Sequence, residues 1–114
     1  MVVDDALYMR VRCKNMLLNK GFFVLEAEDG QVAVSKYLEK HPEVVLMDIT
    51  MPRMDGITAV KEIIKIDPAA RIAMLSAVGQ ENMVLQALSA GAKDFILKPF
   101  EEDRLIQAVK KLIG

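Results

Sequence analysis

The sequence has little cysteine, and it lacks a long apolar run. Its one cysteine, Cys13, excludes an intrachain disulfide and a zinc cluster of cysteines, and such usage fits a reducing cytoplasm. No stretch is long and apolar enough to span a membrane, and no signal peptide is recognisable. We therefore expect a cytoplasmic protein that does not enter a membrane.

Charge of one sign is not in excess either. The 15 basic and 16 acidic residues give a formal net charge of −1, which does not favour binding to nucleic acid or to an anionic membrane surface. Linkers, low-complexity tracts and internal repeats are absent as well. With 114 residues, of which 53% are hydrophobic, the chain has the length and composition of one globular domain over 1–114, and we expect a monomer.

What is present is an alternation of apolar, strand-like runs with helical periodicity. The predicted strands are 1–3, 22–27, 44–47, 71–76 and 94–97, and the predicted helices are 6–20, 30–40, 57–66, 80–90 and 101–113. In the first helix, Leu7, Val11, Leu17 and Leu18 are expected near one buried face. Continuous apolar strands joined by helices predict an α/β fold with a parallel sheet covered on both faces. In a chain this short, right-handed crossovers favour a doubly wound sheet of order 2-1-3-4-5.

Asp48 is the first candidate for chemistry. It ends an apolar run that starts at Val44, and Pro52 and Gly56 then break the chain before the next helix. An ionised carboxylate is costly to bury, so its position at a strand end indicates a function. In open α/β sheets the carboxyl ends of the strands form the ligand crevice.

Polar residues also mark the carboxyl ends of the first, fourth and fifth predicted strands, which are consecutive with the third in this order. They are Asp4 and Asp5 after the first strand, Ser76 at the end of the fourth and Lys98 after the fifth. Three carboxylates in one crevice would repel each other, and Mg²⁺ is the cation that best relieves this with oxygen ligands. Lys98 would add a second positive charge and Ser76 a hydroxyl donor. This set is suited to phosphoryl transfer, with Asp48 as the nucleophile.

Each residue alone has a simpler interpretation. Asp4 and Asp5 could be an N-cap pair for the first helix, and Asp55 fits a turn and a helix cap. Lys98 alone would be a solvated surface lysine. Their joint placement at the strand ends favours a functional site.

Five motifs resemble the receiver domain of two-component response regulators, in order and at the spacing of that family. They are Val2-Val3-Asp4-Asp5, the run from Leu46 to Gly56 (LMDITMPRMDG), Ser76-Ala77, Gly91-Ala92-x-Asp94-Phe95 and Leu97-Lys98-Pro99-Phe100. The resemblance covers the whole chain and is strongest to stand-alone chemotaxis regulators of the CheY kind. It implies the CheY-like fold, which has the same strand order.

The resemblance also implies residue roles. Asp48 matches the phosphorylated aspartate, and Asp4 and Asp5 match the acidic pair that positions Mg²⁺, with the backbone carbonyl of Thr50 as a further ligand. Ser76 matches the switch hydroxyl.

Lys98 matches the lysine that pairs with the phosphoryl group, and Lys98-Pro99 matches a bond that is cis in the family. Phe95 matches the switch aromatic, which is commonly Tyr in chemotaxis regulators. Thr50 and Val78 match two positions that tune water attack, and neither carries a carboxylate or amide that would orient a water molecule. We therefore expect slow self-dephosphorylation.

The expected function is a signalling switch that takes a phosphoryl group from a histidine kinase onto Asp48 with Mg²⁺ and then changes partner binding, most specifically in chemotaxis. Whether such a phosphoacceptor counts as an enzyme is partly a matter of definition. The expected partners are the kinase, an output protein such as the flagellar motor switch, and a phosphatase. The alternatives are a phosphorelay intermediate, a receiver cut from a larger regulator, an Asp-nucleophile phosphatase and a flavin-binding module. A flavin module would need a phosphate-cradling loop where Asp4 and Asp5 stand.

Overall fold

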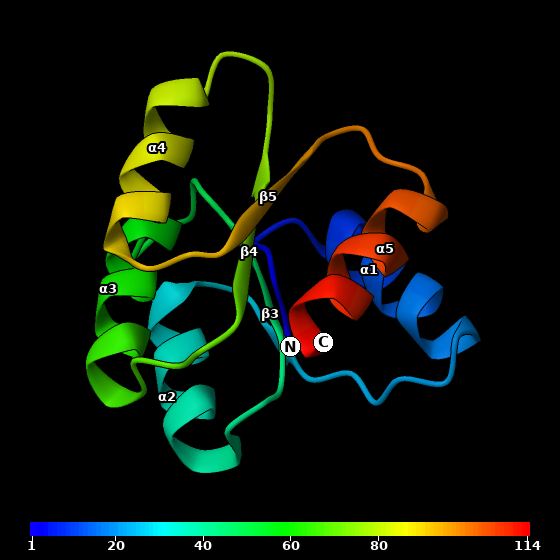
Figure 1. Ribbon diagram of the computed structural model, residues 1–114, viewed down its shortest axis with the longest axis horizontal. Coiled ribbons are helices and arrows are strands. Elements are labelled where there is room, and N and C mark those ends of the chain that lie inside the picture. The colour runs from blue at the N-terminus through cyan, green and yellow to red at the C-terminus, as the bar shows by residue number, and fades with distance from the viewer.

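Five parallel strands form one sheet in the order β2-β1-β3-β4-β5 in the computed structural model, which describes residues 1–114 (Figure 1). The strands are β1 (Val2–Val3), β2 (Glu26–Ala27), β3 (Val45–Asp48), β4 (Ile72–Ser76) and β5 (Asp94–Leu97). The helices are α1 (Leu7–Asn19), α2 (Gly30–Lys40), α3 (Gly56–Ile66), α4 (Glu81–Ala90) and α5 (Glu102–Ile113). The predicted α/β fold and strand order are confirmed. None of the helices has the length and apolar character needed to cross a membrane.

Two helical layers cover the sheet, because the strands bury side chains on both faces. Along β3, Val45 and Met47 pack toward α2, α3 and α4, whereas Leu46 packs toward α1 and α5. Figure 1 shows these two groups of helices on opposite sides of the sheet. This arrangement leaves the carboxyl ends of the strands uncovered at one end of the sheet, between the two helical layers.

The second strand is shorter than predicted. We expected residues 22–27, but only Glu26–Ala27 are paired as a strand. β2 lies at the edge of the sheet, so β1 is its one neighbour, and that pairing begins with the Val2 amide donating to the Leu25 carbonyl at 2.8 Å. Residues 22–24 have no strand beside them, and apolar composition alone cannot supply the missing hydrogen bonds.

The predicted buried face of the first helix is correct only for Leu17. Leu7, Val11 and Leu18 are exposed, whereas Leu17 is buried together with Cys13, which the prediction did not include. Apolar residues occur on most sides of this helix, so helical spacing did not distinguish the face that packs on the sheet.

Gly56 brings the start of α3 against the end of β3. A Cβ at this position would collide with the carbonyl oxygen of Asp48, and the Gly56 amide donates to the Ile49 carbonyl at 2.7 Å. Asp55 caps the helix by accepting from the Thr58 amide at 2.8 Å, as its sequence context predicted. The close approach fixes the loop that carries Asp48.

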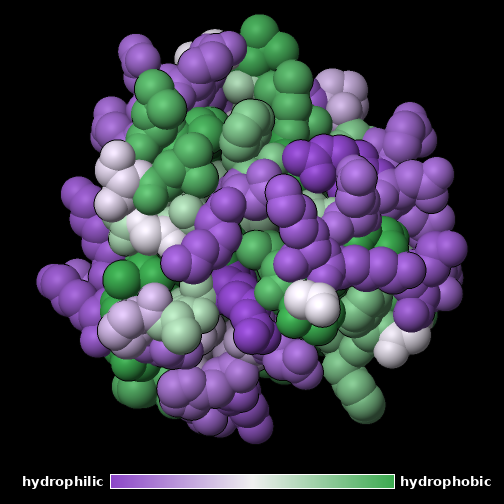
Figure 2. All heavy atoms as spheres, viewed as in Figure 1, coloured by the Kyte–Doolittle hydropathy of each residue, from purple (hydrophilic) through white to green (hydrophobic).

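The side of the molecule formed by α4 and β5 presents apolar side chains to solvent. Figure 2 shows green side chains gathered in the upper part of this view, where Figure 1 places α4. The exposed apolar residues of this region are Val78, Met83, Leu85, Phe95 and Leu97. Phe95, the predicted switch aromatic, is therefore in an outward position and is 42% exposed.

Candidate phosphoryl-transfer site

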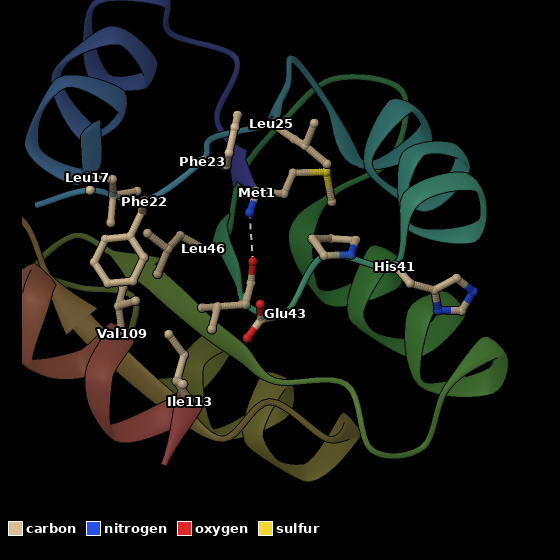
Figure 3. Close-up of a pocket in the computed structure, with 13 residues that line it drawn as sticks. Met1, Leu17, Phe22, Phe23, Leu25, His41, Glu43, Leu46, Val109 and Ile113 are labelled. Carbon is tan, nitrogen blue, oxygen red and sulfur yellow. Dashed lines mark hydrogen bonds between the residues drawn. The ribbon is translucent and has the colours of Figure 1, made fainter.

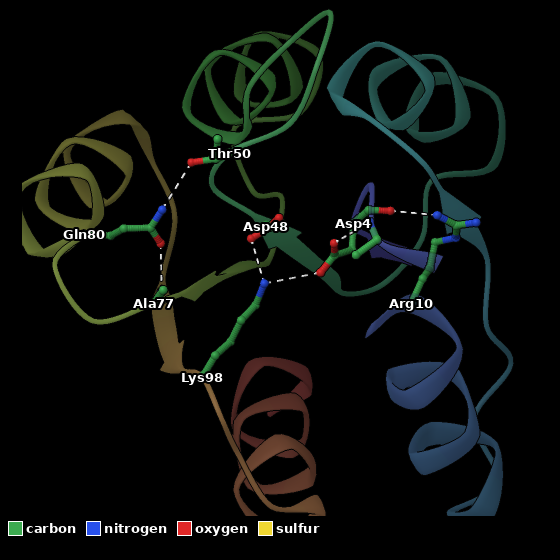
Figure 4. Close-up of polar contacts among 8 residues, drawn as sticks. Asp4, Arg10, Asp48, Thr50, Ala77, Gln80 and Lys98 are labelled. Carbon is green, nitrogen blue, oxygen red and sulfur yellow. Dashed lines mark hydrogen bonds and ion pairs between the residues drawn. The ribbon is translucent and has the colours of Figure 1, made fainter. Parts of the chain in front are cut away.

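The carboxyl ends of three adjacent strands bring the predicted site residues together (Figure 4). Asp4 directly follows β1, Asp48 is the last residue of β3, and Ser76 is the last residue of β4. Lys98 follows β5, at the edge of the sheet, and its side chain extends back across this end. Residues from both ends of the chain thus meet at one point of the fold.

Lys98 joins the two buried carboxylates of this cluster. Its Nζ lies 2.9 Å from Oδ1 of Asp48 and 3.3 Å from Oδ2 of Asp4. Asp4 is 1% exposed and Asp48 9% exposed, so both carboxylates are largely shielded from water. The peptide bond between Lys98 and Pro99 is cis, as the resemblance implied.

The pKa values of this pair reflect burial and mutual charge. Burial is the largest influence on Asp48 and raises the pKa of its carboxyl; Lys98 opposes that rise, and the negative charge of Asp4 adds to it. Burial alone would lower the pKa of Lys98, but the hydrogen bond and charge of Asp48, together with Asp4, outweigh it and raise that pKa. The lysine therefore stays protonated between two carboxylates.

Asp5 completes a cluster with the chemistry of a metal site. One carboxylate oxygen from each of Asp4, Asp5 and Asp48 lies within 4.8 Å of the others, and Asp5 is exposed on the solvent side. Three negative charges against the one positive charge of Lys98 leave an excess of two, which a divalent cation would balance. The donors are hard oxygens, the type that Mg²⁺ prefers.

Asp4 is held by its surroundings rather than by a capping role. Its Oδ1 accepts from the Ala6 amide at 2.9 Å, while α1 begins without any side-chain cap. The carbonyl of Asp4 accepts from Nη1 of Arg10 at 2.8 Å, and Nε of Arg10 pairs with Glu26 on β2 at 3.2 Å. The capping interpretation of Asp4 and Asp5 is therefore wrong in this fold. Sequence reasoning missed Arg10, since a lone arginine on a helix gives no signal of this contact.

A second residue missed by sequence reasoning is Gln80, which precedes α4. Its Oε1 accepts from the Ala77 amide at 2.7 Å, and its Nε2 donates to Oγ1 of Thr50 at 3.2 Å. Figure 4 shows this side chain between Ala77 in the loop after β4 and Thr50 in the loop after β3. An amide is thus present near the site, although Thr50 and Val78 supply none.

Other polar residues lie apart from the site. Cys13 is fully buried, and burial raises the pKa of its thiol to about 11, so this residue acts as a small apolar side chain of the core. His41 is the C-cap of α2.

Cavities also lie away from the carboxylates. A cavity of about 450 Å³ opens beside Met1, Leu46 and Val109, near the amino ends of β1 and β3 (Figure 3). Four cavities of about 240 to 460 Å³ include this one, and none of them is lined by Asp4, Asp48 or Lys98.

Comparison with known proteins decides the family. The profile of the response regulator receiver domain matches residues 1–110. The chain belongs to this family. This receiver domain is 56% identical to the chemotaxis protein CheY of Bacillus subtilis over 115 aligned residues, which cover 100% of the chain and 96% of that protein.

Solved structures agree with the sequence relationship. The receiver domain of NtrX from Brucella abortus superposes with a TM-score of 0.94 at 32% identity, covering 98% of this chain and 95% of that one. A CheX–CheY–BeF₃–Mg²⁺ complex from Borrelia burgdorferi has a TM-score of 0.92 at 38% identity, covering 99% of this chain and 87% of that one. Receiver domains use Mg²⁺ at an acidic site, and this chain has an aspartate cluster of that type.

Proposed function

We propose that this receiver domain accepts a phosphoryl group on Asp48 and that the modified form binds its partners differently. The observation that carries this proposal is the position of Lys98 between Asp48 and Asp4, with Asp5 beside them, at the open edge of the sheet. A nucleophilic carboxylate, a fixed positive charge and a set of oxygen donors are the groups that phosphoryl transfer requires.

The proposed reaction is an in-line displacement by a carboxylate oxygen of Asp48. That oxygen forms a bond to phosphorus, the P–N bond of a partner's phosphohistidine breaks, and the electron pair stays on the imidazole nitrogen. The ammonium group of Lys98 lies 2.9 Å from Oδ1 of Asp48, where it can neutralise charge on the phosphoryl oxygens. Ser76 offers a hydroxyl donor from the end of β4.

Asp4, Asp5 and Asp48 are the residues we propose to hold Mg²⁺, with the backbone carbonyl of Thr50 as a further ligand. The ion supplies a compact double charge that offsets the carboxylates and the incoming phosphoryl oxygens. Two of these residues are fixed before any ion binds: Asp4 by Ala6 and Lys98, and Asp48 by Lys98. Little reorganisation is then needed.

We infer a role in chemotaxis from the relatives. CheY proteins of three bacteria match 97% or more of the chain at 49 to 56% identity. We propose a histidine kinase as phosphodonor, and a flagellar motor switch component and a phosphatase as further partners; the complex of a CheY with CheX in Borrelia burgdorferi supports a partner of the latter kind. A phosphorelay intermediate or a receiver from a larger regulator would use the same site. A cytoplasmic location stays a prediction.

The direct test is a reaction with a small-molecule phosphodonor. One phosphoryl group, labile to base, is expected on the chain when Mg²⁺ is present, and none when the metal is chelated, as measured by intact-protein mass spectrometry. Release of phosphate without a phosphoprotein of measurable lifetime would favour the hydrolase alternative.

Mg²⁺ is expected to raise the melting temperature. At a concentration about ten times the Kd, binding to the folded state alone adds ~1.4 kcal/mol, which is about 5 °C for a chain of this size. Asp5→Ala should abolish the increase while leaving the metal-free protein at least as stable, because repulsion in the cluster falls. Asp103→Ala, an exposed aspartate on α5, is the matched control and should keep the increase. An unchanged melting temperature at millimolar Mg²⁺ would count against the metal site.

Val78→Glu is expected to shorten the lifetime of the phosphorylated form. Val78 is 79% exposed in the loop after β4 and offers no group that can orient a water molecule. A carboxylate two residues past Ser76 would supply one, and we expect dephosphorylation to quicken by about tenfold, below the full range of general-base catalysis. Decay of the phosphoprotein after removal of the donor is the measurement, with Val78→Leu as the control. Equal decay rates in both variants would reject this explanation.

A further inference from the structure

The loop after β4 is closed on itself by one residue, Gln80. Its backbone amide donates to the Ala77 carbonyl at 3.2 Å, and its side-chain Oε1 accepts from the Ala77 amide at 2.7 Å. Both backbone polar groups of Ala77 are therefore bound to Gln80. Since a backbone N–H needs an acceptor, the side-chain amide must present its oxygen to Ala77, which directs its NH₂ group toward Thr50.

The same side chain ties this loop to the one that carries Asp48. Nε2 of Gln80 donates to Oγ1 of Thr50 at 3.2 Å, and Thr50 is two residues past Asp48. Figure 4 shows the resulting bridge, from Ala77 through Gln80 to Thr50. The bridge fixes the spacing of the two loops that directly follow Asp48 and Ser76, both of which are placed in the reaction.

A phosphoryl group on Asp48 would change the balance of hydrogen bonds here. It adds three strong acceptor oxygens, whereas the donors nearby are Lys98, the Ser76 hydroxyl and the backbone amide that follows it. That amide belongs to Ala77 and is already taken by Gln80. Movement of the Ser76 backbone toward a phosphoryl oxygen would carry the Ala77 amide with it, because the carbonyl of Ser76 and this amide belong to one peptide unit.

We propose that the Gln80 side chain is a latch that holds the unphosphorylated arrangement of the site and is released when Asp48 is modified. The latch rests on the proposed phosphorylation of Asp48. It competes with the phosphoryl group for the Ala77 amide, and it breaks the link to Thr50 as the β4–α4 loop moves. Gln80 acts as a positioning residue. Its hydrogen bonds determine how much of the free energy of the phosphoryl interaction is needed to move the β4–α4 loop.

The test uses beryllofluoride as the phosphoryl mimic, at fixed Mg²⁺, with amide chemical shifts followed by NMR. Gln80→Leu removes both side-chain hydrogen bonds, and the midpoint concentration of beryllofluoride is expected to fall about two- to fivefold, the effect of one partly exposed hydrogen bond. Hydrogen exchange at the Ala77 amide should become faster in the unmodified variant. Gln86→Leu, an exposed glutamine further along α4, is the matched control and should leave the midpoint unchanged.

A second variant separates the bridge from a general effect on folding. Thr50→Val removes only the acceptor of the Nε2 bond, so it should lower the midpoint less than Gln80→Leu does. Combined with Gln80→Leu it should lower the midpoint no further, because the bridge is already broken.

The remaining outcomes decide against one proposal or the other. An unchanged midpoint in Gln80→Leu overturns the latch, and so does a higher midpoint, which would make Gln80 a stabiliser of the modified state. Additive effects of the two variants overturn the bridge. Failure of the wild type to bind beryllofluoride, or equal binding by Asp48→Asn, refutes the proposed function instead.

Discussion

Asp48→Asn is expected to abolish phosphorylation of the chain. The amide is nearly isosteric with the carboxylate and keeps an oxygen for Lys98, but it carries no negative charge and is a far weaker nucleophile. Because the wild-type carboxylate is buried beside Asp4, loss of its charge also relieves repulsion, so the variant should fold. Intact-protein mass spectrometry after treatment with a phosphodonor and Mg²⁺ is the measurement, and the expected loss is complete.

Asp55→Asn provides a matched control on the same loop. Asp55 is exposed and caps α3 through the Thr58 amide, and asparagine is an equally good cap. This variant should accept a phosphoryl group as the wild type does. A phosphoryl group that persists on Asp48→Asn would place the acceptor at another residue, and loss in both variants would point to a general effect of the loop.

Phe95→Ala is expected to separate phosphorylation from partner binding. Phe95 lies on β5, paired in register with Met74 of β4, and its ring is 42% exposed. Movement of Ser76 toward a phosphoryl oxygen would free space beside β4 into which the ring can turn. Such a switch requires that phosphorylation favour one of two packing arrangements of the ring. Coupling free energies between two sites typically change an affinity by about 5- to 150-fold. Without the ring, phosphorylation should change the affinity for the partner by less than about twofold.

The ring has no hydroxyl, so its coupling must come from packing rather than from a hydrogen bond. Phe95→Tyr should therefore preserve switching, while Leu97→Ala, an exposed apolar residue two positions further on the same strand, should retain most of it. The readout is the spread of amide shift changes on adding beryllofluoride, together with partner affinity. Changes confined to the Asp48 loop that never reach residues 80–100 would show that this face is not the output surface.

The strand order, and the end of the sheet that carries the site, could be predicted because they depend on patterns that extend along whole strands. The apolar runs that end in Asp48 and Ser76 specify parallel strands, and right-handed crossovers then place their carboxyl ends together. The meeting of Lys98 with Asp4, 94 residues apart in the chain, follows from that order.

The parts that could not be predicted depend on single contacts. The buried face of α1 is chosen by packing against the sheet, and the apolar residues of that helix fit more than one orientation. The bridge through Gln80 depends on the conformation of two loops, which the sequence does not encode as a periodic pattern. A glutamine just before a helix is also too common for Gln80 to be recognised from the sequence.

Cys13 makes the wild-type chain a convenient background for site-specific labelling. The thiol is the only one in the sequence, it is fully buried, and its pKa of about 11 leaves fewer than about one molecule in a thousand as thiolate at neutral pH. A cysteine introduced on the exposed face of α4 would therefore react with a maleimide dye far ahead of the native one. With a second cysteine in the loop that follows Asp48, fluorescence or spin-label distances between this loop and α4 could then be followed without removing the native cysteine.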